Sequence, residues 1–330
     1  MGIIDSGEQT MNDKTKIDIS VLVLTYNSSL KKLFATLYSV LQQNEIDLEI
    51  VISDDGSEQF DQAAIENFFN EKNFKAYKII RHESNQGILK NYCAALNCAS
   101  GRYVKSISPG DCLFAPDTLK NVCRLLNEKD GRVAFGRAAY YRTEPNENKI
   151  RFYCKSNPID VRPYKNQSHK NIQRNYLYYR DYILGAAYVG ERQLLQAYVN
   201  QLIDKVKYAE DCSFILMVAD GIPVFFYSDY IIWYEYGDGI STQKSQKWRE
   251  LLLEDNRACF RIIEKNHAQF KSAIELFFQK RSLRTYIWKI RRKLFFVVGK
   301  VRLKLNWRKE SSKISKHSNF LTKCLKMWRE

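Results

Sequence analysis

The sequence predicts an α/β fold in which a mostly parallel central sheet is flanked by helices and followed by a helical C-terminal extension. Runs of β-branched and other apolar residues fit strands that are buried on both faces, as in a parallel sheet. Between these runs, apolar residues recur at spacings of three and four, which is typical of amphipathic helices that cover a sheet. From about residue 243 onward the pattern is helical throughout.

The predicted elements alternate along most of the chain. Strands are expected at 17–24, 47–53, 76–80, 103–107, 132–141 and 223–234. Helices are expected at 30–41, 61–72, 87–99, 117–126, 191–202 and 211–220. Ser28 or Ser29 suits the N-cap of the first helix, and the pair Ser100-Gly101 suits the end of the third. Residues 156–180 show no regular pattern, and residues 1–16 are expected to form a disordered leader.

The positive charge of the chain is concentrated at its C-terminal end. The formal net charge is +15, yet residues 281–330 alone hold 16 Lys and Arg against two acids. The rest of the chain is therefore nearly neutral. Such asymmetry indicates a polyanion or an anionic membrane surface as a partner. No nucleic acid partner is expected, because the chain contains no recognisable nucleic-acid-binding module.

The eight cysteines form no C-x-x-C pair, and the four histidines show no zinc-ligand spacing. Several of these cysteines lie inside predicted helices, as small buried hydrophobic residues do. We interpret them as reduced thiols in the cytosol. The first residues lack the charged start and apolar run of a signal peptide. No uncharged apolar stretch reaches the ~20 residues that a membrane-spanning helix needs. A cytoplasmic location is therefore expected.

Two adjacent aspartates end the second predicted strand. Asp54 and Asp55 are followed by Gly56, which allows the chain to turn sharply. Ligands of open α/β sheets bind in the crevice beyond the carboxyl ends of the strands. Carboxylates at that edge suit hydrogen-bond donors of a ligand, such as a ribose hydroxyl or the N–H of a pyrimidine. Asp is also a favoured turn residue, so turn formation alone is the alternative interpretation.

Several stretches of the chain, in this order, resemble the family 2 glycosyltransferases. They are SVLVLTYN (20–27), ISDDGS (52–57), NQGILKNYCAALNCASGRYV (85–104), Asp111 after the next strand, and AED (209–211) before a helix. The resemblance covers about residues 19–125 well and residues 183–245 more loosely. It implies the GT-A fold, a nucleotide-sugar-binding α/β sandwich. The implied catalytic domain spans 17–242, with a nucleotide-sugar-binding half (17–125), an acceptor half (126–242) and a basic helical region after it (243–330).

The resemblance also implies which residues bind the nucleotide-sugar donor. These are Thr25, Tyr26, Asn27, Asp54, Asp55, Asn85, Gly87, Lys90 and Asp111. Among them, Asp55 is expected to hold the uracil or the ribose, with Asp54 beside it. Lys90 lies one turn into the third helix and is expected to reach a donor phosphate. A solvated helix lysine is an equally supported interpretation of Lys90.

The sequence departs from the family at the metal site. Where the family has Asp-x-Asp, often followed by a further Asp, this chain reads Ser108-Pro109-Gly110-Asp111. Mn²⁺ and Mg²⁺ prefer several oxygen ligands and often share those of a diphosphate. Asp111 with diphosphate oxygens is therefore the expected metal site, and a turn aspartate is its structural alternative. In a metal-free site, Lys90 or an arginine from residues 162–180 would have to stabilise the leaving group.

Asp211 matches the catalytic base of the family. Direct displacement needs one carboxylate that takes the proton of the acceptor hydroxyl while the oxygen attacks the anomeric carbon. That single step inverts the configuration at this carbon. Glu210 and Asp211 also precede a predicted helix, where the helix dipole favours acids. This second interpretation is stronger for Glu210 than for Asp211.

Residues 281–309 combine cations with apolar residues at helical spacing, so a helix here has one apolar and one basic face. Such a helix lies in the membrane interface without crossing the bilayer. Residues 320–328 repeat the pattern on a smaller scale. The alternative is a helical subdomain that packs on the catalytic core or on a second copy of the chain.

Together these predictions favour an inverting glycosyltransferase of the bacterial cell-surface polysaccharide type. It would move a sugar from a UDP-sugar to a saccharide or lipid-linked saccharide acceptor at the inner membrane face. The alternative is a nucleotide-sugar-binding protein without catalysis, which the altered metal motif favours. No motif identifies the acceptor, whose recognition is expected in residues 140–205.

Overall fold

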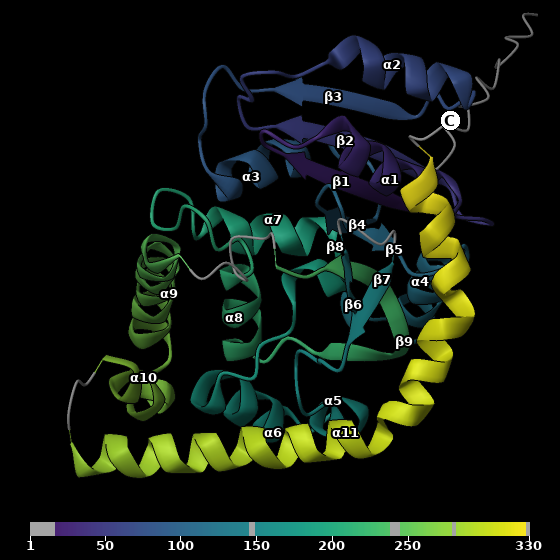
Figure 1. Ribbon diagram of the computed structural model, residues 1–330. Coiled ribbons are helices and arrows are strands. Elements are labelled where there is room, and N and C mark those ends of the chain that lie inside the picture. Colours follow the sequence, from purple (N-terminus) through teal and green to yellow (C-terminus); the bar gives the residue numbers. More distant parts are fainter. Residues whose placement is uncertain (1–16, 145–148, 238–244, 279–281, 328–330) are drawn as a thin grey trace, which may run out of the picture.

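A computed structural model describes residues 17–144, 149–237, 245–278 and 282–327 (Figure 1). The leader predicted at 1–16 and the domain boundary predicted between 242 and 243 lie outside the described residues.

The first half of the sheet is parallel, as predicted. Its strands are β1 (Ile19–Thr25), β2 (Leu48–Asp54), β3 (Tyr77–Arg81) and β4 (Tyr103–Ile107). They lie in the order β3-β2-β1-β4, and each neighbouring pair is parallel. The register places Thr25 beside Asp54 and Val23 beside Ile107. The carboxyl ends of these strands therefore meet at one edge, which is where ligands of such sheets bind.

The second half of the sheet is mixed in direction. Its strands are β5 (Cys112–Leu113), β6 (Val133–Thr143), β7 (Ile150–Tyr153), β8 (Tyr188–Glu191) and β9 (Val224–Glu235). β8 pairs antiparallel with β4 and β6, whereas β6 and β9 are parallel. The sequence did not predict β8, because four residues are too few to show a strand period.

Helices cover both faces of the sheet. They are α1 (Leu30–Leu41), α2 (Gln62–Glu71), α3 (Ile88–Cys98), α4 (Thr118–Glu128), α7 (Arg192–Asn200), α8 (Cys212–Ala219) and α9 (Gln246–Asn266). Successive residues of β1 point to opposite faces. Val21 and Val23 pack in one cluster with α1, α2 and α4, whereas Leu22 packs with α3, α7, α8 and α9.

Residues 156–180 are more regular than predicted. They include two short helices, α5 (Arg162–Lys165) and α6 (His169–Gln173), and one π-helical turn, η1 (Arg174–Tyr179). Tyr164 and Tyr176 from this stretch are buried in the main core. Elements of one or two turns are too short for a helical period to be recognised in the sequence.

The C-terminal region is helical, as predicted. α9 leads through η3 (Ala268–Phe270) and α10 (Lys271–Phe278) to α11 (Leu283–Lys326), a helix of 44 residues. Figure 1 shows α11 running beneath α10, α6 and α5 and then curving upward past β9 and α4. The end of this helix packs on the core, because Leu321 and Cys324 are buried in one cluster with Trp233. The second basic and apolar segment, residues 320–328, therefore packs on the core as far as residue 327. This is the alternative interpretation given above for the C-terminal helices.

Candidate active site

Asp54 ends β2, and its carboxylate is occupied by the turn that follows. One carboxylate oxygen accepts the backbone N–H of Ser57 at 2.8 Å, and the other accepts the Ser57 hydroxyl. The Asp54 side chain is fully buried. A donor contact from Asp54 stays a prediction, whereas its part in the turn is directly visible.

Asp55 binds the loop that leads into α3. Its two carboxylate oxygens accept the N–H of Gln86 at 2.7 Å and the N–H of Gly87 at 3.0 Å. Burial raises the pKa of Asp55, and the two N–H groups act in the opposite direction. Each carboxylate oxygen has a second lone pair, so Asp55 can still accept a hydrogen bond from a ligand.

Three loops meet at this edge of the sheet. They follow β1 (residues 26–29), β2 (residues 55–61) and β3 (residues 82–87). Gly56 has a φ of +76°, and a Cβ there would lie 2.6 Å from the carbonyl carbon of Ser84, so only glycine fits. Asn27 joins the first loop to the second, because its N–H donates to the Ser57 hydroxyl oxygen at 2.7 Å. Of the other predicted donor residues, Thr25 is buried, whereas Tyr26 and Asn85 are exposed.

Two lysines lie near the start of α3. The Nζ of Lys90 lies 3.1 Å from a carboxylate oxygen of Asp204, in an exposed ion pair. Lys207 lies against the loop of residues 82–87, here called the donor loop, because a Cβ at Gly87 would lie 2.6 Å from its Cγ and 3.1 Å from its Cε. The carbonyl of Lys207 also accepts the N–H of Leu89 at 3.1 Å. Sequence reasoning missed Lys207, for which proximity to the AED motif was the only available signal.

The loop that carries Asp211 is fixed by an acid from α9. The buried carboxylate of Asp255 accepts the N–H of Lys207 at 3.0 Å, of Tyr208 at 2.7 Å and of Ala209 at 3.0 Å. Hydrogen bonds to an ionised acceptor are strong, so Asp255 holds the backbone directly before Glu210. Sequence reasoning also missed Asp255, because an acid in an amphipathic helix gives no signal of its partner.

In the part of the chain that the structure describes, no hydrogen bond from another side chain reaches the carboxylates of Glu210 and Asp211. Burial raises the pKa of Glu210 to about 8, and the charges of Asp211 and Asp255 add to this rise. Burial and the Asp255 charge raise the pKa of Asp211 to about 6. Because the charge of Asp211 raises the pKa of Glu210, the pair loses its two protons in separate steps, and the carboxylate that ionises first suits a general base.

The short segment of Gly185 and Ala186, before β8, lies between Asp211 and Lys105, and Lys105 in turn acts on Asp111. A Cβ at Gly185 would lie 3.4 Å from the Cβ of Asp211. The next carbonyl, that of Ala186, accepts a hydrogen bond from the Nζ of Lys105 at 2.7 Å. Lys105 is fully buried in β4, and its charge acts on Asp111. Sequence reasoning missed Lys105, although a lysine inside a buried strand was a signal that could have identified it.

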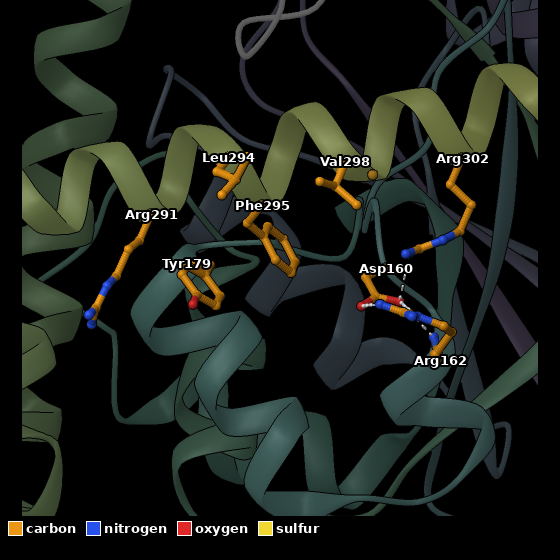
Figure 2. A pocket seen from close by; sticks show the side chains of 9 residues that line it. Asp160, Arg162, Tyr179, Arg291, Leu294, Phe295, Val298 and Arg302 are labelled. Carbon is orange, nitrogen blue, oxygen red and sulfur yellow. Dashed lines mark hydrogen bonds and ion pairs between the residues drawn. The ribbon is translucent and has the colours of Figure 1, made fainter.

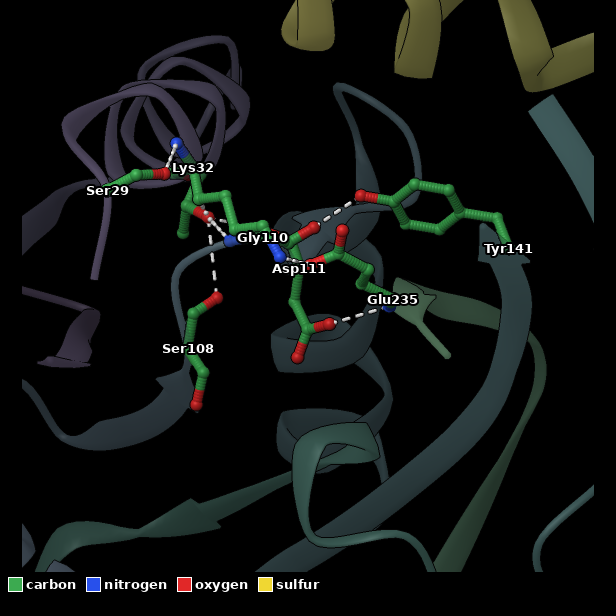
Figure 3. A network of polar contacts seen from close by, with 8 residues as sticks. Ser29, Lys32, Ser108, Gly110, Asp111, Tyr141 and Glu235 are labelled. Atoms are coloured by element: carbon green, nitrogen blue, oxygen red, sulfur yellow. Dashed lines mark hydrogen bonds and ion pairs between the residues drawn. The ribbon is translucent and has the colours of Figure 1, made fainter. Parts of the chain in front are cut away.

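Asp111 belongs to a polar network around the turn after β4 (Figure 3). Its Oδ1 accepts the backbone N–H of Glu235 at 2.8 Å, and Oε2 of Glu235 lies 2.7 Å from the Nζ of Lys32. The hydroxyl of Tyr141 donates to the carbonyl of Gly110. Burial raises the pKa of Asp111 to about 7, while the charges of Lys105 and Lys32 lower it.

This network does not fit a metal ion held by the protein. Across the described parts of the chain, no three His, Cys, Asp or Glu side chains gather as metal ligands. Asp111 is only 5 % exposed, and its two neighbouring lysines are already engaged or buried: Lys32 pairs with Glu235, and burial lowers the pKa of Lys105 to about 7. A metal ion at Asp111 would need the diphosphate oxygens of the donor as further ligands, so the metal site and the donor contact of Asp111 both stay predictions.

Comparisons with known proteins agree with this architecture. The structure of S. aureus TarS 1-349 in complex with UDP-GlcNAc has a TM-score of 0.56 and 20% identity, covering 79% of this chain and 72% of that one. The TarS complex with UDP has a TM-score of 0.54 and 19% identity, covering 79% and 71%. The mannosyltransferase PcManGT from Pyrobaculum calidifontis, in complex with GDP-Man and Mn²⁺, has a TM-score of 0.55 and 13% identity, covering 94% and 86%. At these identities the likeness shows the fold alone. No curated protein matches the chain.

The family described as Glycosyl transferase family 2 matches residues 20–184. This match covers half of the chain and includes Thr25, Asp55 and Asp111, whereas the loop with Asp211 follows it. The chain therefore belongs to the family 2 glycosyltransferases, and it is a glycosyltransferase built on a mixed α/β sheet with helices on both faces.

Proposed function

We propose that the protein is an inverting glycosyltransferase that moves a sugar from a UDP-sugar to a saccharide or lipid-linked saccharide in bacterial cell-surface polysaccharide synthesis. The observation that carries this proposal is the acid pair Glu210–Asp211. Both acids are buried at the start of α8, burial raises the pKa of each, and Asp255 fixes the loop that carries them. An ionised carboxylate that is not engaged by other side chains is what a general base requires.

In the proposed reaction the acceptor hydroxyl oxygen forms a bond to the anomeric carbon of the donor. The bond from that carbon to the diphosphate breaks, and its electron pair leaves with UDP. The proton of the hydroxyl passes to the carboxylate of Asp211. Because attack and departure occur in one displacement, the configuration at the anomeric carbon is inverted.

The donor would bind at the carboxyl edge of β1, β2 and β4. Asp55 would accept a hydrogen bond from the uracil or the ribose, beside the loops of residues 25–27 and 85–87. The UDP and UDP-GlcNAc bound to TarS support a UDP-sugar, and the GDP-Man bound to PcManGT makes a GDP-sugar the alternative donor. Lys207 lies over the donor loop, so we assign to it the charge that stabilises the leaving diphosphate.

A donor screen tests this proposal. UDP or GDP release is measured with a panel of UDP-sugars and with GDP-mannose, using short saccharides as acceptors, in EDTA and in Mn²⁺. We expect release of UDP from one UDP-sugar, with activity persisting in EDTA. Release from GDP-mannose alone would overturn the donor assignment. Tight UDP binding in calorimetry with no turnover of any donor would favour the non-catalytic alternative.

We further infer that the protein associates peripherally with the inner membrane face. No helix in the described residues is long and apolar enough to span a bilayer. The first part of α11 nevertheless exposes nine large apolar side chains, here called the exposed stripe: Leu283, Tyr286, Ile287, Ile290, Leu294, Val297, Val298, Val301 and Leu305. Their spacings of three and four place them on one face of the helix.

Basic residues accompany the exposed stripe. Lys289, Lys293 and Lys300 lie between its members and are exposed. Each cation near an anionic leaflet contributes about 1 kcal/mol to membrane binding. A helix with an outward apolar face and flanking cations lies in the plane of the membrane interface. This arrangement would bring the enzyme to lipid-linked acceptors.

A further inference from the structure

A cavity of about 400 Å³ lies between α11 and the segment of α5 and η1 (Figure 2). It is formed by other residues than those of the candidate active site. Leu294 and Val298 of the exposed stripe line it, so the cavity opens directly beside that stripe. Cavities of this size accommodate small ligands.

The lining of the cavity carries an excess of positive charge. Arg162, Arg291 and Arg302 line it, against the carboxylate of Asp160. Arg162 uses its Nε and Nη2 to hold Asp160, both at 2.8 Å, and Arg302 lies 3.9 Å from the same carboxylate. Within the described residues no carboxylate lies within 4.0 Å of Arg291. Figure 2 shows Arg291 at one end of the cavity and the other two arginines at the opposite end.

The remaining wall of the cavity is apolar. The rings of Tyr179 and Phe295 stack with centroids 4.5 Å apart and an interplanar angle of 11°. The side chains of Leu294 and Val298 are 62% and 47% exposed, so they continue this wall onto the surface. The cavity thus joins guanidinium groups to an apolar path along the helix, which matches a ligand with an anionic head and a hydrocarbon tail.

We propose that this cavity binds the phosphate headgroup of an anionic phospholipid, whose acyl chains lie along the exposed stripe. The proposal rests on the membrane association inferred above and adds a specific lipid site to it. Guanidinium forks match phosphate oxygens in geometry and charge, and arginine is therefore the residue of choice for phosphate. A free phosphate ion would make no use of the apolar wall, which is why we assign the site to a lipid.

A matched pair of variants separates the cavity from general attraction to the membrane. Arg291→Gln and Lys293→Gln each remove one charge from the same turn of α11, but only Arg291 lines the cavity. Cosedimentation is measured with phosphatidylcholine vesicles that contain or lack phosphatidylglycerol. We expect Lys293→Gln to weaken binding to the anionic vesicles about fivefold. Arg291→Gln should weaken it roughly tenfold more, because its hydrogen bonds to the phosphate are also lost.

The outcomes distinguish this proposal from the one on which it rests. Equal losses in the two variants would overturn the lipid site and leave membrane association standing. If the unmodified protein does not bind anionic vesicles, membrane association fails and the lipid site fails with it. UDP release with a soluble acceptor is measured in parallel, and its persistence in both variants would show that transfer is independent of the cavity.

Calorimetry with monomeric ligands identifies the occupant. Short-chain dioctanoyl phosphatidylglycerol, dioctanoyl phosphatidylcholine and inorganic phosphate are titrated into the full chain. We expect binding of the first alone, lost in Arg291→Gln and retained in Lys293→Gln. Inorganic phosphate bound as tightly as the anionic lipid would overturn the lipid assignment. Equal binding of both lipids would overturn recognition of the charged headgroup.

Discussion

Two pairs of adjacent acids lie near the carboxyl edge of the sheet, and they differ in their hydrogen-bond partners. Asp54 and Asp55 receive hydrogen bonds from Ser57, Gln86 and Gly87, so protein donors engage both carboxylates. In the described residues, Glu210 and Asp211 receive none from other residues, and burial raises the pKa of both. The difference indicates that the first pair shapes the donor loops, whereas the second pair is available for proton transfer.

The largest expected effect that tests this contrast is the loss of turnover in Asp211→Asn. Without a carboxylate to take the acceptor proton, we expect the rate of UDP release in the presence of acceptor to fall about 10³-fold. Glu210→Gln is the matched control, because it replaces the neighbouring acid, whose pKa burial also raises, with a neutral group of the same shape. We expect a loss of only a few-fold in this control. A larger loss in Glu210→Gln than in Asp211→Asn would exchange the roles of the two acids.

The first acid pair should respond in stability instead. Asp54→Ala removes two buried hydrogen-bond acceptors and leaves the N–H and the hydroxyl of Ser57 without them. We expect the free energy of unfolding to fall by about 2–3 kcal/mol, measured by denaturant titration. Asp211→Asn should leave this free energy unchanged or raise it, since it removes a charge that burial disfavours. An Asp54→Ala variant of unchanged stability that no longer binds UDP would make Asp54 a donor ligand.

Periodicity and local motifs were sufficient to predict most of the fold. The strands β1 to β4 and the helices α1 to α4 follow alternating runs that the sequence displays directly. The two parts of α11 show the limit of this reasoning. Leu305 is 80% exposed and Leu321 is fully buried, although both lie in similar basic and apolar sequence. Which side chains of the helix meet the core depends on tertiary contacts that the helix sequence alone does not show.

In the candidate site, too, local motifs were visible in the sequence, whereas contacts between distant residues were not. Asp55 and Asp211 could be proposed from the sequence because they belong to short motifs at strand or helix ends, and their roles stay predictions. Asp255 and Lys207 were not, because each acts through a contact with a residue distant in sequence. The loss of Asp-x-Asp was visible in the sequence, but the positive charge that Lys32 and Lys105 bring to Asp111 was not.

The pH dependence of kcat/KM tests whether the general base is a buried acid. Burial raises the pKa of Asp211 to about 6, and only its ionised form accepts a proton. Below this pH we expect kcat/KM to fall about tenfold per pH unit, and above it to reach a plateau. An acidic limb near pH 4, the ordinary range of an exposed aspartate, would contradict the buried base.

The smallest expected effects separate the two lysines near the donor loop. Lys207→Gln should weaken UDP binding about tenfold in calorimetry, since this side chain lies over the loop that Asp55 holds. Lys90→Gln should change UDP affinity by less than about twofold, because Lys90 is engaged in an exposed ion pair with Asp204. A larger loss of UDP affinity in Lys90→Gln than in Lys207→Gln would instead assign the phosphate contact to Lys90.

The anomeric configuration of the product reports whether transfer proceeds by one displacement assisted by Asp211. Once the donor screen has identified the sugar, nuclear magnetic resonance of the purified product reports the configuration at the transferred carbon. We expect inversion, because Asp211 removes a proton and no carboxylate attacks the sugar. Retention of the donor configuration would contradict it, since retention requires a route other than a single displacement assisted by one base.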